Sequence, residues 1–66
     1  HVHIAPGATL SGDVEVGDGA HIGTGASVRN GVTIGARAAV GVGAAVINDV
    51  AAQARVAGVP AKEMLK

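Results

Sequence analysis

Histidine is the residue type in this chain best suited to acid–base chemistry, and three histidines are present. Because its ordinary pKa lies close to neutral pH, a histidine can accept a proton and release it again during a reaction. His3 and His21 are eighteen residues apart, and His1 lies two residues before His3. A functional interpretation places His3 at a site, whereas a simpler one makes both His3 and His21 surface residues at strand ends.

The carboxylates make a weaker case for chemistry. Asp13, Glu15 and Asp18 cluster in one short stretch, which suits either a catalytic set or a solvated edge. We favour the solvated edge, because charges on exposed strands discourage the sheets of different molecules from pairing. Arg29 and Arg37 interrupt a glycine pattern and are expected to point outward.

The composition excludes several classes of protein. The chain has 66 residues without Phe, Trp, Tyr or Cys, and its five basic residues balance its five acidic ones. Without cysteine there is neither a disulfide scaffold nor a Cys-ligated zinc site. Without aromatic rings or net positive charge, binding to nucleic acid is not expected. No apolar run approaches the roughly 20 residues that cross a bilayer, so membrane insertion is not expected.

A repeat of six residues explains how such a chain can fold. Counted from Ile4, the first position of each hexad is aliphatic and the fifth is Ala or Val. A period of six does not match the 3.6 residues of a helical turn, but it suits a short strand followed by a tight turn. Glycine is frequent at the second and fourth positions, where it permits positive φ and close approach of backbones. The first positions are Ile4, Leu10, Val16, Ile22, Val28, Ile34, Val40 and Val46, and the fifth positions are Ala8, Val14, Ala20, Ala26, Val32, Ala38, Ala44 and Val50.

Three hexads are expected to close one triangular coil, whose successive coils pair in parallel about 4.8 Å apart. Residues eighteen apart then stack, so His3 should lie against His21. The aliphatic first positions fill the interior, and a prism this narrow has no room for aromatic rings. The sequence therefore predicts an all-β fold, a parallel β-helix over 1–57 with regular hexads over 4–51 and a short C-terminal cap.

The last nine residues, 58–66, depart from the repeat and predict a turn out of the coil. The stretch 61–65 is expected to form one short helical turn. Met64 and Leu65 would then fold back over the last coil, because an open coil end leaves strand edges unpaired. The residues His1–His3 read as the second half of a hexad, so we expect the chain to be the C-terminal piece of a longer protein.

The repeat of one aliphatic residue, one glycine and four variable residues resembles the hexapeptide-repeat acyltransferases, which fold as a left-handed parallel β-helix. The ending AGVPAK at 57–62 is similar to the family's usual exit from the helix. The stretch 3–35 resembles the branch of sialic-acid O-acetyltransferases and nucleotide-amino-sugar N-acetyltransferases. The left hand is implied by the resemblance alone and is an exception to the usual right-handed crossover.

The resemblance implies an acetyltransferase that moves an acetyl group from acetyl-CoA to an amino or hydroxyl group of a sugar or sugar nucleotide. In the family, the β-helix forms a homotrimer and acetyl-CoA lies in the groove between neighbouring helices. The resemblance also implies a cytoplasmic protein. The family's catalytic base is a histidine that would lie upstream of His1. No catalytic residue is therefore expected within this chain, and the isolated piece is expected to be inactive.

Four residues match family positions that meet the cofactor. His3, in the motif His-Ile-Ala-Pro-Gly-Ala, matches a histidine near the acetyl group, and Gly12 matches a loop glycine close to the thioester. Thr24 and Val42 match positions whose backbone meets the pantetheine arm. A groove lined with backbone suits such an arm, and a backbone N–H can stabilise the oxyanion that develops during acyl transfer.

Two alternatives stay open. The chain could be a structural β-helix, a trimerisation stalk or cap with no site for CoA. Some hexapeptide-repeat proteins are zinc-dependent carbonic anhydrases with three histidine ligands. The spacings of two and eighteen between His1, His3 and His21 do not match that site, so no metal is expected. Arg29 or Arg37 could meet a CoA phosphate or a neighbouring subunit.

Overall fold

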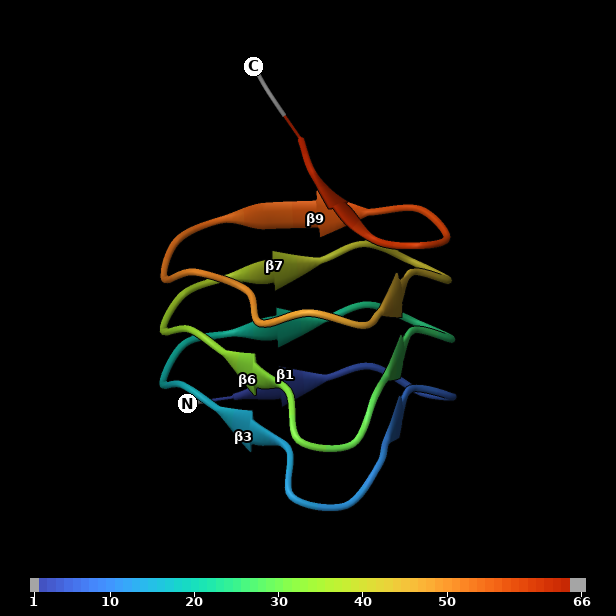
Figure 1. Cartoon of the computed structure of the whole chain (residues 1–66), viewed down its shortest axis with the longest axis horizontal. Helices are drawn as coiled ribbons and strands as arrows, with labels where there is room; N and C mark the ends of the chain where they lie inside the picture. The colour runs from blue at the N-terminus through green and yellow to red at the C-terminus, as the bar shows by residue number, and fades with distance from the viewer. Residues whose placement is uncertain (1, 65–66) are drawn as a thin grey trace.

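The computed structural model describes residues 2–64, which wind into a triangular coil with short strands on its three sides (Figure 1). Face A is a five-stranded sheet in the order β1 (His3–Ile4), β4 (His21–Ile22), β7 (Ala39–Val40), β9 (Arg55–Ala57) and β10 (Lys62–Glu63). Face B has the order β2 (Thr9–Leu10), β5 (Ser27–Val28) and β8 (Ala45–Val46). Face C pairs β3 (Glu15–Val16) with β6 (Thr33–Ile34). The predicted all-β fold, a parallel β-helix, is confirmed.

The coil is left-handed, as the family resemblance implied. In Figure 1 the chain crosses the back through β1, turns forward on the right and returns along the front through β3, while each coil lies above the one before it. Strands eighteen residues apart pair in parallel, so that Ile4 lies opposite Ile22 and Ile22 opposite Val40. The predicted stacking of hexads is therefore present on face A.

The first-position side chains fill the inside of the coil. Ile22, Val28, Ile34, Val40 and Val46 are almost completely buried, and the fifth-position alanines pack beside them under the turns. Full burial of one such aliphatic side chain stabilises a fold by roughly 1.5–3 kcal/mol. This stack of branched aliphatic side chains supplies the driving force for folding.

Glycine occupies two positions of the hexad for two different reasons. At the second position a side chain would collide with the next coil, since a Cβ on Gly17 would lie 2.5 Å from the backbone nitrogen of Ala36. At the fourth position φ is positive, a conformation that glycine adopts without steric cost. Asp13, Arg37 and Gln53 also adopt it there, with φ values of 61°, 60° and 65°. The geometry of the corner is thus the same whichever residue occupies it.

The last coil is shorter than the others by two residues. Val56 pairs with Val40, and Val50 pairs with Ile34, so each of these shifts is sixteen residues instead of eighteen. Val50 and Val56 therefore occupy first positions, which face the core. The sequence-based assignment of Val50 to a fifth position is wrong, because the unit that begins at Val46 contains only four residues. The unbroken hexads end before Val46, and not at residue 51 as expected.

A β-hairpin covers the upper end of the coil. The chain turns at 58–61 and returns as β10, antiparallel to β9, where the N–H of Met64 donates a 2.8 Å hydrogen bond to the carbonyl oxygen of Arg55. The expected helical turn over 61–65 is wrong as far as the structure describes it, and Leu65 lies outside the described residues. Residues 2–64 contain no helix with the length and apolar character needed to cross a membrane.

Candidate functional site

His3 and His21 lie side by side on the outer surface of face A. They are paired residues of β1 and β4, their ring centroids are 4.7 Å apart, and the two ring planes differ by 3°. Stacked aromatic pairs have centroids about 4.5–7 Å apart, so the two imidazoles are in stacking contact. Both side chains are exposed, because each precedes an inward-facing isoleucine in its strand. The stacking predicted from their spacing is confirmed.

Thr24 and Val42 lie one above the other at the corner that follows face A. The N–H of Gly43 donates a 2.9 Å hydrogen bond to the carbonyl oxygen of Thr24, and the N–H of Gly25 donates one of 3.3 Å to that of Pro6. Pro6, Thr24 and Val42 therefore form one column along the edge of the prism. Val42 is 79% exposed, so this edge presents both backbone and an apolar side chain to the surroundings.

The third position of the hexad carries backbone donors without acceptors. Within residues 2–64, the N–H groups of Gly12, Thr24 and Val42 donate no hydrogen bond. By contrast, the residues immediately before and after Thr24 and Val42 all donate one from their N–H groups. Because an N–H without a protein partner must bind water or a ligand, these exposed groups are available for recognition. Two of them, at Thr24 and Val42, lie in one column.

A groove with a volume of about 290 Å³ runs along face A beside this column. Backbone and aliphatic side chains line part of it, and an imidazole, a guanidinium and a thioether line the rest. A slender polar chain could lie along the backbone and still meet the imidazole of His21 and the guanidinium of Arg55. The residues that line it are His21, Gly23, Ala39, Val40, Gly41, Val42, Arg55, Val56 and Met64.

Two glycines keep the backbone wall of the groove open. A Cβ on Gly23 would lie 2.8 Å from both the carbonyl oxygen of Val40 and the nitrogen of Val42. A Cβ on Gly41 would lie 3.0 Å from the Cβ of Ala57. The stacking of the coils therefore requires glycine at position 23 and leaves little room for a side chain at position 41, and both residues line the groove with main chain alone.

Gly12 lies at a different corner from the other three candidate residues. It follows β2 on face B, and its carbonyl oxygen accepts a 3.1 Å hydrogen bond from the N–H of Gly31. A Cβ built on Gly12 would meet no atom within 4 Å, so packing in this chain does not require glycine there. The structure thus brings His3 onto the face that borders Thr24 and Val42, but it does not bring Gly12 to them.

The groove also contains two residues that the sequence analysis did not select, Arg55 and Met64. Arg55 lies opposite Ala39, which lies opposite His21, so all three point outward from face A. The shortened unit after Val46 hid this alignment, because unbroken hexads do not place Arg55 in that column. The sequence signal for the shortened unit is the pair Val50 and Val56. If the unit that begins at Val46 is counted as four residues instead of six, both valines fall on first positions, which are aliphatic throughout the repeat.

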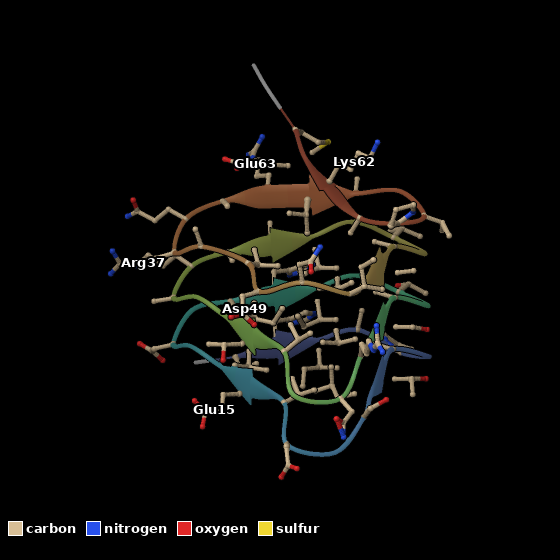
Figure 2. All side chains as sticks on the ribbon, in the orientation of Figure 1. Glu15, Arg37, Asp49, Lys62 and Glu63 are labelled. Atoms are coloured by element: carbon tan, nitrogen blue, oxygen red, sulfur yellow. The ribbon has the colours of Figure 1, made fainter. Side chains whose placement is uncertain are left out.

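Three further charged side chains lie outside the groove. Arg29 is exposed at the corner after face B. Arg37, at the corner after face C, and Glu15, on face C, are exposed as well (Figure 2). None of these three lines the groove. Among residues 2–64, no three or more His, Asp or Glu side chains come close enough together to hold a metal ion.

Comparison with known proteins gave matches among solved structures. No family model and no curated protein matches the chain. The acetyltransferase domain of PglB from Neisseria gonorrhoeae, also solved in complex with acetyl coenzyme A, is 44% identical with a TM-score of 0.94, over 96% of this chain and 31% of that one. A mutant of perosamine N-acetyltransferase from Caulobacter crescentus, in complex with CoA and GDP-perosamine, is 43% identical with a TM-score of 0.97, over 98% of this chain and 31% of that one.

A serine acetyltransferase in complex with CoA is similar as well, at 36% identity and a TM-score of 0.91, over 96% of this chain and 28% of that one. The sugar N-acetyltransferase and PglB are thus more similar to this chain than the serine enzyme is. The chain spans about a third of the length of the structures it matches. The resemblance to hexapeptide-repeat acetyltransferases is confirmed.

Proposed function

Because the chain belongs to the hexapeptide-repeat acyltransferases, we propose that it forms the acetyl-CoA-binding part of an enzyme that acetylates an amino or hydroxyl group of a sugar or sugar nucleotide. The observation that carries the proposal is the column of unpaired N–H groups at Thr24 and Val42 beside a groove lined with backbone. The pantetheine arm of CoA is slender and carries two amides, whose carbonyl oxygens accept hydrogen bonds from such donors.

The reaction itself needs three contributions from the protein, which are a base, a hydrogen-bond donor for the developing negative oxygen, and a side chain that positions the acetyl group or the acceptor. The acceptor nitrogen or oxygen bonds to the thioester carbon, the carbon–sulfur bond breaks, and the CoA thiolate leaves and takes a proton. A base removes the proton of the acceptor, which typically contributes roughly 10²–10⁴-fold in rate. A backbone N–H stabilises the negative oxygen of the intermediate.

We assign two of these contributions to candidate residues and leave the base to the part of the protein before His1. His3 contacts the acetyl group or the acceptor from face A, where its ring is exposed. Gly12 provides an unpaired N–H close to the thioester, and since it lies at another corner, it serves the groove of a neighbouring copy. A homotrimer of parallel prisms has three equal grooves and satisfies this arrangement.

Titration of the purified chain with CoA tests the proposal. The amide signals of Thr24 and Val42 and the ring signals of His3 are followed by NMR, and the oligomeric state is measured on the same sample. Saturable shifts of the Thr24 and Val42 amides are expected. If a confirmed trimer shows no shift at millimolar CoA, the chain is a structural trimerisation module instead. Acetyl transfer by the chain alone would contradict the assignment of the base to another segment.

A further inference from the structure

The imidazole of His3 has few internal contacts to hold it. It lies on β1, an edge strand of face A, which has a paired strand on one side only. Ile4, the next residue, is 46% exposed, whereas Ile22 at the equivalent place in β4 is completely buried. Among residues 2–64, no hydrogen bond or ion pair involves the His3 side chain. Because an exposed side chain without such a bond exchanges between staggered rotamers, the stacking on His21 is the contact that selects one orientation of the ring.

Stacking holds the plane of a ring and leaves its nitrogens unoccupied. The rings of His3 and His21 are parallel to within 3°, and their centroids are 4.7 Å apart. An imidazole donates and accepts hydrogen bonds through Nδ1 and Nε2, which lie at the edge of the ring. A face-to-face contact covers the π-surface and leaves this edge accessible. His3 is thus oriented without a hydrogen bond that would compete with a substrate.

His21 is the better-anchored member of the pair. Its strand, β4, is paired with β1 below it and with β7 above it, so the backbone of His21 is held from two sides. His21 also lines the groove, whereas His3 does not. The ring of His21 therefore stacks on His3, and its side chain also borders the space in which we place the pantetheine arm. The constraint acts from His21 on His3, and not in the opposite direction.

We propose that His21 is a positioning residue for acetyl transfer. Its ring holds the His3 imidazole by stacking, so that a nitrogen of His3 faces the acetyl group of bound acetyl-CoA. His21 itself exchanges no proton with the substrates. The inference rests on the proposed function, which brings the acetyl group to His3. It gives His21 a role that needs a flat ring at position 21 and does not need the nitrogens of that ring.

Two substitutions at position 21 separate the flat ring from its nitrogens. His21→Ala removes the ring, and the alanines at the same outward hexad position in β7 and β8 show that the coil accepts a methyl group there. His21→Phe keeps a flat ring, which points outward and so avoids the narrow interior. Ser27→Ala is the matched control, since Ser27 is the outward residue of β5 and pairs with the exposed Thr9 on face B.

The orientation of the His3 ring is measured first. Three-bond NMR couplings report the χ1 rotamer of His3, and nuclear Overhauser effects report contact between the two rings. We expect one dominant rotamer in the original chain, in His21→Phe and in Ser27→Ala, and averaging over several rotamers in His21→Ala. A single His3 rotamer in His21→Ala would overturn the proposal, because the ring would then be held without its neighbour.

Binding then tests whether this orientation matters for the acetyl group. Acetyl-CoA and CoA differ only by the acetyl group on sulfur, so the ratio of their dissociation constants isolates the contacts to that group. We expect His21→Ala to bind acetyl-CoA about 2- to 12-fold more weakly, which corresponds to one hydrogen bond, and CoA with less than about twofold change. His21→Phe and Ser27→Ala should bind both compounds as the original chain does. The measurement needs no turnover and is therefore independent of the base before His1.

The outcomes distinguish this inference from the proposed function. If the original chain binds neither CoA nor acetyl-CoA, the proposed function fails and the inference fails with it. If the original chain binds both and His21→Ala weakens both equally, or weakens neither, the inference alone is wrong. It is wrong as well if His21→Phe binds acetyl-CoA as weakly as His21→Ala, since the nitrogens of residue 21 would then be what acetyl-CoA requires.

Discussion

The carboxylate of Asp49 takes the place of a backbone carbonyl for Thr33. The N–H of Thr33 donates a 2.9 Å hydrogen bond to Oδ1 of Asp49. In complete hexads the equivalent N–H donates to a carbonyl in the next coil, as that of Ser27 does to Ala44 at 2.8 Å. Because the unit from Val46 has only four residues, that carbonyl is displaced. Figure 2 shows Asp49 on the segment that lies above β6, where it continues face C.

We therefore expect Asp49→Ala to destabilise the chain although its side chain is exposed. The loss of one hydrogen bond costs about 0.5–1.5 kcal/mol, measured as the free energy of unfolding in urea. Asp49→Asn retains an acceptor oxygen and should lose less. Glu15→Ala removes an exposed carboxylate from the same face and is the control, with a change of less than about 0.5 kcal/mol. Equal losses for the alanine variants at 49 and 15 would mean that this hydrogen bond does not hold the shortened coil.

Most of the fold could be predicted because the hexad pattern depends on packing alone. An inward-facing residue must be aliphatic and a corner must be narrow, so the phase of the repeat is readable from Ile4 to Val46. The shortened unit could not be found in this way, since Val50 fits both a fifth and a first position by type. The clearest difference between the two phases is the residue at the next first position, because unbroken hexads put Ala52 in the core and the shortened unit puts Val50 and then Val56 there.

The conformation of the C-terminal cap was predicted wrongly for a different reason. Its residues favour a helix by intrinsic propensity, but so short a stretch does not sustain one. The hydrogen bond from Met64 to Arg55 shows that pairing with the upper edge of β9 prevails. For the site, spacing was enough to predict the stacking of His3 on His21, because it depends only on register. The position of Arg55 was not predictable without the shortened unit.

The glycines should differ in their response to alanine according to position. Gly23→Ala places a Cβ 2.8 Å from backbone atoms of the next coil and should prevent folding or cost several kcal/mol. Gly25→Ala has open space but a φ of 72°, so a loss of about 1 kcal/mol is expected. Gly12→Ala has open space and no positive φ, and should change the unfolding free energy by less than about 0.5 kcal/mol.

Thermal or urea unfolding of the three variants checks this order. A Gly12→Ala variant as unstable as Gly25→Ala would contradict it. If stability is unchanged but CoA binding weakens in Gly12→Ala, the glycine at position 12 has its role at the ligand and not in the coil.

Truncation of a core side chain to alanine should destabilise the chain in proportion to how deeply that side chain is buried. Ile34 is completely buried, whereas Ile4 on the first coil is 46% exposed. Truncation of a buried isoleucine to alanine costs about 2–5 kcal/mol, which is a large share of the stability of a small domain. We expect Ile34→Ala to be largely unfolded by circular dichroism at 25 °C and Ile4→Ala to stay folded. If both variants lose structure to a similar extent, the first coil contributes as much to the stability of the fold as the buried middle coils do, and the prediction is wrong.

The unpaired N–H groups of the third position can be removed without changing the fold. Pro6 occupies this position at the same corner as Thr24 and Val42, which shows that the backbone there accepts proline. In Thr24→Pro the preceding residue is Gly23, which has no Cβ to clash with the proline ring. We therefore expect Thr24→Pro to unfold at nearly the same urea concentration as the original chain, but to bind CoA about 2- to 12-fold more weakly, which corresponds to one hydrogen bond.

The matched control for this substitution is Ala36→Pro. Ala36 is a third-position residue at the corner after face C, also preceded by a glycine, and it does not line the groove. Its variant should bind CoA like the original chain, because the deleted N–H lies at another edge of the prism. Val42→Pro should weaken binding as Thr24→Pro does. If all three proline variants bind CoA equally well, the pantetheine arm does not lie against this column, and the donor geometry at Thr24 and Val42 has no part in binding.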